Sequence, residues 1–494
     1  MSKISFNGSI LILGCGSVSQ CLQPLLLQNL DIDFKKITIM DFLDMRHTVK
    51  DMLDAGASYV QERITRDNMD EVLDEYVGVG DMLIDLAWNI DCCEIMQWCH
   101  DHTVMYINTS VEIWDPYEAA GEVTPMDRTL YVRHMALRRM ANKWTTPGAT
   151  AVIEHGANPG LVSHWTKVAL EDIAREALTL GRQRKPVLNK RDATRVESYL
   201  ADQDWARLAM TLGVKVIHIS ERDTQIGNKP KEVGEFVNTW SVEGFREEGV
   251  APAELGWGTH ERRLPLGANK HLYGPGNQIC LSQCGIDTYV RSWVPDGGEI
   301  NGMVVRHGEA FTISDYLTVW EDAPMMSEPL YRPTVHYAYM PCDSAIVSLW
   351  EMRMKGYKIQ DRYRIMKDEI VSGKDELGVL LLGHCLNGWW VGSQLSIEES
   401  RRLVPGQNAT TVQVCASILG AMAWMIRNPR MGFCVADELP HREVLDVANQ
   451  FLGTSVSVPT NWSPLQNRVD PFEDFGKSRP SNDDEWQFET FLLR

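Results

Sequence analysis

A glycine-rich hexapeptide near the N-terminus has the residue types and spacing that bind the pyrophosphate of a dinucleotide. Residues 14–19 read GCGSVS and lie between a predicted strand, residues 9–13, and a helical pattern. In this fingerprint the first glycine permits a tight turn, the second lets the backbone approach the phosphates, and the helix N-terminus offers free N–H groups. Ser19 replaces the third glycine and loosens the match. The residues expected to contact the dinucleotide are Gly14, Gly16, Ser17, Val18 and Ser19.

An acidic residue, Asp41, follows the glycine turn at the distance that the fingerprint requires. It ends a second predicted strand, residues 36–40. A carboxylate there binds the adenosine ribose hydroxyls and repels a 2′-phosphate, which favours NAD over NADP. Two alternatives stay open, because Asp41 could instead cap the next helix and Arg46 lies close enough downstream to accommodate NADP.

Two further polar segments follow predicted strands, at the sheet edge where the ligand crevice opens in such folds. Residues 107–112 end in Glu112, a candidate for contact near the nicotinamide. Its alternative is a helix-start or surface charge. Residues 152–160 form a strand and then a sharp turn, in which Asn158 could position an amine or the nicotinamide amide. Asn-Pro-Gly segments also occur as plain turns.

The elements that must position these residues alternate between strand and helix. Beyond the second strand the alternating segments are residues 51–61, 70–76, 82–86, 95–100 and 104–107. Such alternation is typical of βαβ units on a parallel sheet, so we predict an α/β fold with a Rossmann doubly wound sheet. At 494 residues the chain is longer than one hydrophobic core supports, which predicts two or three domains.

Composition narrows the class of partner and the compartment. The 48 basic and 67 acidic residues give a net charge of −19, which argues against nucleic acid and for a cationic ligand. The 11 cysteines lack the spacing of a metal site, so we expect reduced thiols and no metal. There is no signal-peptide pattern, and the longest apolar stretch, residues 415–426, is too short to span a bilayer. We therefore expect a cytoplasmic protein with no membrane partner.

Beyond these local patterns, the chain resembles the bacterial homospermidine synthases, a family of saccharopine dehydrogenase-like enzymes. The segments that carry the resemblance run over almost the whole length. They are residues 14–19, 156–160, 217–225, 238–245, 254–259, 336–339, 377–383 and 392–399. The segments around Glu221 and Trp240 distinguish these synthases from ordinary saccharopine reductases.

The resemblance implies a reaction in which NAD is recycled. Putrescine would be oxidised by bound NAD to an imine, a second diamine would attack the activated carbon, and ammonia would leave. The retained NADH would then reduce the new imine to homospermidine. Spermidine would also serve as aminobutyl donor and release diaminopropane.

The resemblance further implies roles for individual residues. Trp240 would hold a cation on its aromatic face without drawing off its proton, while Glu221 and Glu248 would hold or deprotonate the amines. The reaction centre would be lined by Asn158, Glu112 and His307. Asn89 falls where relatives are expected to carry a carboxylate, so its role as an amine anchor is in doubt. Further cofactor contacts are expected from Thr109, Ala157, Asn158 and Pro159.

Each of these roles has a plainer alternative. A tryptophan such as Trp240 is more often part of the packing, and an isolated histidine such as His307 is more often structural. Glu243, Glu247 and Glu248 lie so close in the sequence that the choice among them stays open.

The resemblance also implies the domain organisation. We expect an NAD-binding Rossmann domain in residues 1–155 and an inserted α/β domain for substrate binding and dimerisation in residues 156–405. Residues 406–494 would return to the Rossmann domain and end in a tail, and the chain would form a homodimer. Two other functions stay open. One is a net NAD(P)-dependent saccharopine or carboxynorspermidine dehydrogenase-like oxidoreductase, and the other is a non-catalytic NAD-binding protein.

Overall fold

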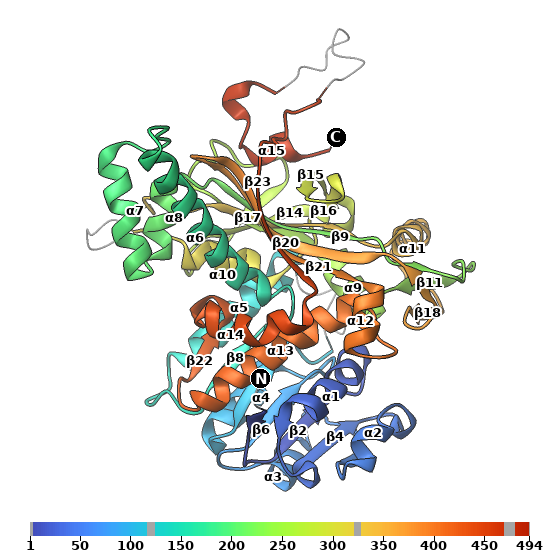
Figure 1. The fold of residues 1–494 in the computed structure, drawn as a ribbon. Coiled ribbons are helices and arrows are strands. Elements are labelled where there is room, and N and C mark those ends of the chain that lie inside the picture. The colour runs from blue at the N-terminus through green and yellow to red at the C-terminus, as the bar shows by residue number, and fades with distance from the viewer. Residues whose placement is uncertain (1–2, 116–123, 321–327, 469–479, 494) are drawn as a thin grey trace.

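The computed structural model describes residues 3–115, 124–320, 328–468 and 480–493, and its strands form two large sheets (Figure 1). All strand pairs of the first sheet are parallel, in the order β22-β8-β7-β6-β2-β4-β5. Their bounds are β2 Ile10–Leu13, β4 Ile37–Asp41, β5 Ser58–Gln61, β6 Met82–Asp85, β7 Met105–Asn108, β8 Ala151–Ile153 and β22 Phe433–Val435. The predicted Rossmann-type parallel sheet is confirmed.

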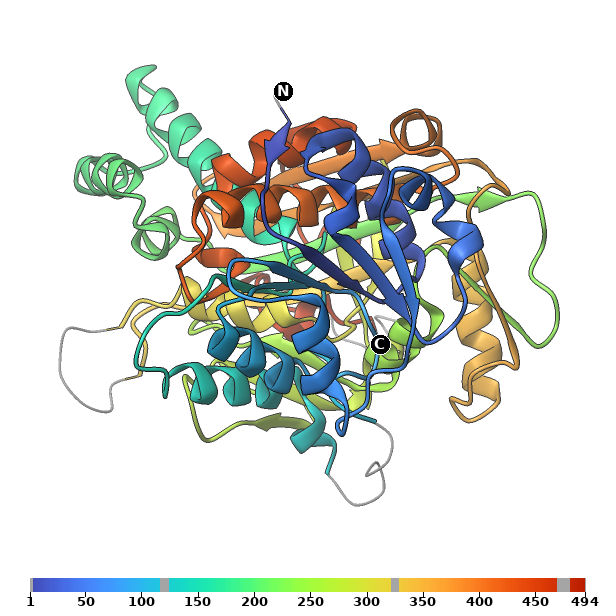
Figure 2. The same cartoon turned by 90° about the horizontal axis from the view of Figure 1, so that it is seen from below.

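Helices cover both faces of this sheet, as Figure 2 shows from below. Side chains of β2 alternate between two cores, because Ile10 and Ile12 pack with one set of helices and Leu11 and Leu13 with the other. The first set is α1 Ser17–Asn29, α2 Lys50–Asp54 and α13 Ala409–Arg427, and the second includes α3 Met69–Tyr76, α4 Cys92–His102 and α5 Leu130–Ala141. Burial on both faces explains the continuous apolar runs of the strands. The stretch 51–61 contains a helix and then a strand, α2 and β5.

The second sheet is mixed and has ten strands, with the path β13-β14-β12-β17-β9-β20-β21-β23 and the hairpin β15 and β16 beside it. Among its described strands, β9 and β17 form the one parallel pair. The bounds are β9 Val216–Asp223, β12 Pro252–Gly256, β13 Ala268–Lys270, β14 Gln278–Cys284, β15 Tyr289–Val294, β16 Gly298–Met303, β17 Thr334–Met340, β20 Lys374–His384, β21 Asn387–Ser396 and β23 Thr454–Thr460. This sheet belongs to the α/β unit that the fold prediction inserted after the Rossmann sheet, and its mixed strand directions were not part of the prediction.

Helices and short strand pairs surround the mixed sheet. The helices are α6 Leu161–Arg182, α7 Lys190–Asp202, α8 Trp205–Leu212, α9 Val242–Val250, α10 Gly308–Tyr316, α11 Asp343–Met354, α12 Ile397–Leu403 and α15 Phe488–Phe491. The short pairs beside it are β10 Ile226–Gly227 with β19 Ile370–Ser372 and β11 Glu235–Asn238 with β18 Arg362–Ile365, whereas β1 Ile4–Ser5 with β3 Leu30–Asp31 lies in the Rossmann part next to α1.

The C-terminal part of the chain crosses from one sheet to the other. Helix α13 packs against α1, and β22 then joins the edge of the Rossmann sheet, followed by α14 His441–Ala448. Strand β23 next pairs with β21 of the mixed sheet, so residues 406–494 contribute to both. By length and composition α13 could cross a membrane, but 83% of its most apolar window is buried inside the protein. Its apolar side chains therefore belong to the core between α1 and α14.

Candidate active site

A cavity of about 700 Å³ opens at the carboxyl ends of β2, β4 and β6, and residues 14–19 form part of its wall. Gly14 has φ +85°, and a side chain there would bring Cβ to 2.6 Å from the carbonyl oxygen of Leu86. At Gly16 an added Cβ would meet no atom within 4 Å, so the backbone is open to an approaching group. Gly16 caps α1 without a side-chain hydrogen bond, which leaves the helix N-terminus open to an anion.

Asp41 lies in the wall of the same cavity and also braces the glycine turn. Its Oδ2 accepts a hydrogen bond from the Cys15 amide at 2.7 Å, and its Oδ1 accepts one from the Leu43 amide at 2.9 Å. Helix α2 begins after Val49, so Asp41 is not its cap. Arg46 is ion-paired with Asp44, with 2.9 Å between Nε and Oδ1. A turn open to phosphates and a carboxylate at the end of β4 are the features that hold a dinucleotide.

Asn89 lies in this nucleotide cavity, whose lining also includes residues that sequence reasoning missed, such as Trp88 and Arg63. Asn89 has φ +62°, and its buried Oδ1 has no hydrogen-bond partner within the described part of the chain. It lines this cavity and not the smaller one, described next, that contains Glu112, Glu248 and His307. Ala157 is buried and lines neither this cavity nor the smaller one described next.

A small cavity of about 40 Å³ brings together five of the predicted residues. It is lined by Thr109, Glu112, Pro159, Glu248 and His307, among others. His307 Nε2 lies 3.0 Å from Glu248 Oε2, and its Nδ1 lies 3.2 Å from Oε1 of Glu309. Burial lowers the pKa of His307, but the carboxylates of Glu309 and Glu248 outweigh burial and raise it well above the usual value. The imidazole is thus held as a cation between two carboxylates.

Glu112 enters this small cavity from the loop after β7. Its Oε1 accepts a hydrogen bond from the Ser110 hydroxyl at 2.9 Å, while its buried Oε2 has no hydrogen-bond partner among the residues that the structure describes. Burial, with a contribution from the charge of Glu247, raises the pKa of Glu112 to about 8. The side chain can therefore exchange a proton near neutral pH.

Glu221 lies on β9, buried in the middle of the mixed sheet. Its Oε2 accepts hydrogen bonds from the hydroxyl of Tyr337 on β17 and from Asn158 Nδ2, the latter at 3.3 Å. The Asn158 turn thus connects the Rossmann part to this carboxylate. Burial raises the pKa of Glu221 to about 8, although the bond from Tyr337 acts in the opposite direction.

Two more buried carboxylates, Asp223 and Asp375, accompany Glu221, and sequence reasoning missed both. They face each other as cross-strand partners of β9 and β20. Thr239 donates to Asp223 Oδ2 at 2.8 Å, and Thr410 donates to Asp375 Oδ2 at 2.6 Å. Burial and the charges of Glu221 and Asp223 raise the pKa of Asp375 well above its usual value. No local motif signals this cluster, because the register between distant strands creates it.

Trp240 extends the site with an aromatic group. Its Nε1 donates to the hydroxyl of Tyr339 at 3.0 Å, and Phe245 stacks against its ring at a centroid distance of 5.2 Å. Tyr339 in turn stacks with Tyr337, the residue that donates to Glu221. An aromatic path therefore connects Trp240 to the buried carboxylates.

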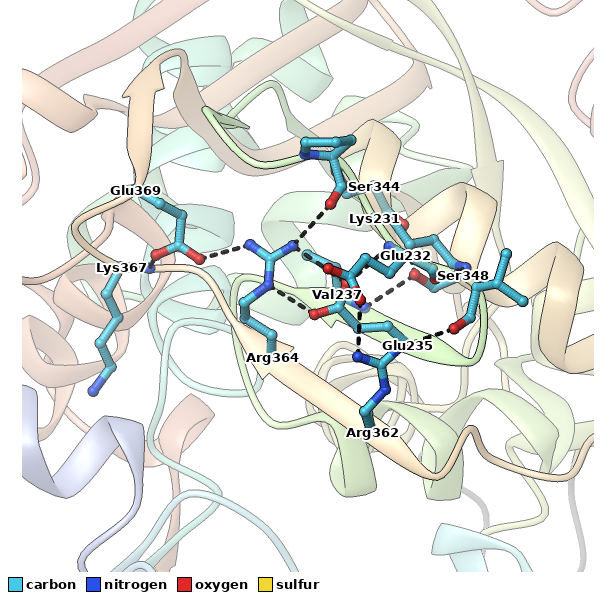
Figure 3. Close-up of polar contacts among 12 residues, drawn as sticks. Lys231, Glu232, Glu235, Val237, Ser344, Ser348, Arg362, Arg364, Lys367 and Glu369 are labelled. Atoms are coloured by element: carbon cyan, nitrogen blue, oxygen red, sulfur yellow. Dashed lines mark hydrogen bonds and ion pairs between the residues drawn. The ribbon is translucent and has the colours of Figure 1, made fainter.

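An ion-pair network positions the strand that leads into Trp240, and Figure 3 shows it. Strand β11 ends two residues before Trp240 and pairs with β18. Arg364 on β18 binds Glu235 at 2.9 Å and Glu369 at 2.8 Å. Lys367, just after β18, donates a hydrogen bond from Nζ to the side-chain oxygen of Gln20 on α1 at 2.6 Å. The Arg364–Glu235 ion pair thus holds β18 to β11, and Lys367 links this strand pair to the Rossmann part.

The structure separates the three neighbouring glutamates of α9. Glu243 lines the nucleotide cavity, and Glu248 contacts His307. Glu247 is ion-paired with Arg133 and Arg306, each at 2.7 Å. Glu248 is the one that faces the imidazole, and Glu247 is held by guanidinium groups.

Together these groups form a buried, acidic and aromatic site next to a nucleotide cavity. Carboxylates with raised pKa values can accept protons from ammonium groups, and an aromatic face can hold a cation. Such a site suits an amine substrate.

Comparisons with known proteins agree with this chemistry. A family model of the saccharopine dehydrogenase NADP binding domain matches residues 10–152, and a model of the saccharopine dehydrogenase C-terminal domain matches residues 156–454. Homospermidine synthase of Blastochloris viridis is 42% identical over 494 residues, which cover 99% of this chain and 98% of the relative. Homospermidine synthase of Mesorhizobium japonicum is 39% identical over 496 residues, with 99% of this chain and 97% of the relative covered.

A solved structure gives the same result in three dimensions. The crystal structure of homospermidine synthase from Legionella pneumophila in complex with NAD is 37% identical to this chain and superimposes with a TM-score of 0.86. The match covers 100% of this chain and 99% of that chain. The chain therefore belongs to the saccharopine dehydrogenase family and, within it, to the homospermidine synthases.

Proposed function

We propose that this protein is an NAD-dependent homospermidine synthase, which transfers an aminobutyl group from putrescine or spermidine to putrescine. The observation that carries the proposal is the cluster of Glu221, Asp223 and Asp375 beside Trp240, in a chain 42% identical to a homospermidine synthase. Three buried carboxylates and an aromatic ring suit a cationic diamine, and they do not suit a substrate whose binding group is a carboxylate.

Different residues carry out the separate steps of the amine chemistry. Glu221 and Glu112 accept protons, because an amine must be neutral before its carbon loses hydride. Glu248 stabilises the positive charge that develops at that carbon, and the protonated imidazole of His307 beside it returns a proton to the leaving ammonia. Asn158 orients Glu221, and Trp240 holds the far ammonium. Bound NAD supplies a hydride acceptor and later the donor.

The cofactor contacts follow from the nucleotide cavity. We assign Gly14, Gly16, Ser17, Val18 and Ser19 to the pyrophosphate, and Asp41 to the ribose hydroxyls. Thr109 and Pro159, which line the small cavity, and Ala157 behind the turn belong to the nicotinamide end. We also propose domains 1–155, 156–405 and 406–494 and a homodimer, because the family resemblance implies them, and a cytoplasmic location, as expected from the sequence patterns.

Incubation of the protein with putrescine and NAD tests the proposal. We expect homospermidine and ammonia to accumulate in equal amounts over many turnovers while free NADH does not, because each hydride removed is returned. The measurement is product chromatography together with absorbance at the NADH band. One NADH for each amine consumed would contradict the proposal and indicate a net oxidoreductase. Bound NAD without any amine product would indicate a non-catalytic protein.

Asp41→Ala tests the cofactor preference. We expect weaker NAD binding and a relative gain for NADP, because the carboxylate no longer binds the ribose hydroxyls or repels a 2′-phosphate. The quantity to measure is the ratio of the two dissociation constants, since the bond from Asp41 to the glycine turn affects both cofactors alike. Asp54→Ala, an exposed aspartate on α2, is the control. An unchanged ratio would show that Asp41 only supports the turn.

A further inference from the structure

A second buried charge cluster lies beside the amine site and consists of Glu247, Arg133 and Arg306. Both guanidinium groups donate to the same oxygen, Glu247 Oε1, each at 2.7 Å. The side chains are only 7%, 9% and 3% exposed, respectively. Burial raises the pKa of Glu247, but the two guanidinium groups outweigh it and lower the pKa, so this carboxylate stays charged.

The three residues come from different parts of the chain and meet at the boundary of two cavities. Arg133 lies on α5 and Arg306 follows β16, while Glu247 lies on α9. All three line the small cavity that contains Glu112, Glu248 and His307. They also line an adjoining cavity of about 1000 Å³. A substrate that extends from one cavity into the other therefore lies close to the net positive charge of these three side chains.

Two arginines are unusual beside a site for diammonium substrates. A free, buried guanidinium repels ammonium and binds carboxylates strongly through paired hydrogen bonds. Here the second nitrogen of each guanidinium donates to the backbone, Arg133 to Val111 and Arg306 to Arg128, each at 2.7 Å. These hydrogen bonds to the backbone hold the two guanidinium groups in place but do not neutralise their positive charge. Glu247 neutralises part of it by direct contact with both guanidinium groups, whereas Glu112 and Glu254 act on them from farther away.

We propose that Glu247 is a specificity-determining residue, which engages both guanidinium groups and so makes the cavity select diamines over amino acids of the same length. This inference rests on the proposed function. Without the Glu247 charge, Arg133 and Arg306 would turn the same cavity wall into a carboxylate-binding surface. The residue acts through the two arginines and need not contact the substrate.

Glu247→Gln tests this role with two ligands of equal length, putrescine and 4-aminobutanoate. We expect the KM for putrescine to rise about tenfold or more with a smaller change in kcat, because two buried cations that have lost their direct ion-pair partner disfavour an ammonium. We expect the inhibition constant of 4-aminobutanoate to fall by a similar factor. A purely structural defect would weaken both ligands. Glu176→Gln, an exposed glutamate on α6, is the matched control.

Glu247→Asp provides the second variant. It keeps the charge but is one methylene shorter, so it should engage the two arginines less well and give intermediate shifts of both constants. If Glu247→Gln does not fold, as a thermal melt would reveal, the Asp variant decides. Folded variants with both constants unchanged, or with both ligands weakened equally, would overturn the inference. Failure of the wild-type protein to form homospermidine would instead overturn the proposed function.

Discussion

Glu221→Gln is expected to lower kcat/KM for putrescine about 10³-fold, within the usual range for loss of an acid-base group. Glutamine preserves the shape and can still accept the hydrogen bonds from Tyr337 and Asn158, but it cannot take up a proton or hold an ammonium by charge. The measurement is steady-state homospermidine formation at pH 8. Activity within a few fold of wild type would remove Glu221 from the proposed chemistry.

The pH profile gives an independent readout of the same residue. Because burial raises the pKa of Glu221 to about 8, the charged form that accepts a proton is the minority at neutral pH. In the wild type, kcat/KM should therefore rise with pH and level off above about pH 8. Glu112, with a pKa also near 8, contributes to the same rise of kcat/KM with pH. The Glu221→Gln variant should therefore still show a rise, but a shallower one.

The thermal stability of Glu221→Gln shows whether a loss of activity comes from the missing carboxylate or from unfolding. A carboxyl whose pKa is raised in the folded state destabilises the fold as the pH rises from its unfolded value of about 4.3 towards 8. Glutamine does not ionise and so does not cause this decrease in stability. The melting temperature of Glu221→Gln at pH 8 should therefore be no lower than that of the wild type. The matched control is Glu261→Gln, because the Glu261 side chain is also buried and its pKa is raised to about 7, but it lies outside the site. Its activity and pH profile should stay as in the wild type.

The parts of the fold that follow local sequence rules were predictable from the sequence. The glycine turn, the parallel strands and Asp41 at the end of β4 depend on short-range patterns, because buried parallel strands are apolar runs and a tight turn requires a glycine such as Gly14. The stretch 51–61 was ambiguous because its helix has only five residues before the strand β5 begins.

The parts of the site that depend on register could not be predicted in this way. Asp223 and Asp375 become neighbours only because β9 and β20 pair with one alignment, and a shift of one residue would move a side chain to the other face. The choice among Glu243, Glu247 and Glu248 likewise required the positions of Arg133, Arg306 and His307.

Trp240→Ala is expected to lower kcat/KM for putrescine at least about 30-fold, whereas Trp240→Phe should keep a substantial part of the activity. An aromatic face returns roughly 2 kcal/mol to a desolvated cation, and the phenyl ring preserves that face with a weaker quadrupole. Both variants lose the hydrogen bond from Nε1 to Tyr339, so the difference between them isolates the ring face. NAD affinity should not change, because Trp240 does not line the nucleotide cavity.

Packing is the competing explanation for Trp240, because its ring also stacks on Phe245. Replacing a buried tryptophan with alanine can lower the free energy of unfolding by about 3 to 5 kcal/mol. Assays must therefore run below the melting temperature of each variant, with Trp350→Ala as control, since Trp350 is 54% exposed on α11. A cation-holding role predicts that a folded Trp240→Ala protein loses affinity for putrescine more than it loses kcat. Equal activity of the Ala variant, or inactivity that tracks unfolding, would assign Trp240 to packing alone, and the buried carboxylates would then have to hold the far ammonium without it.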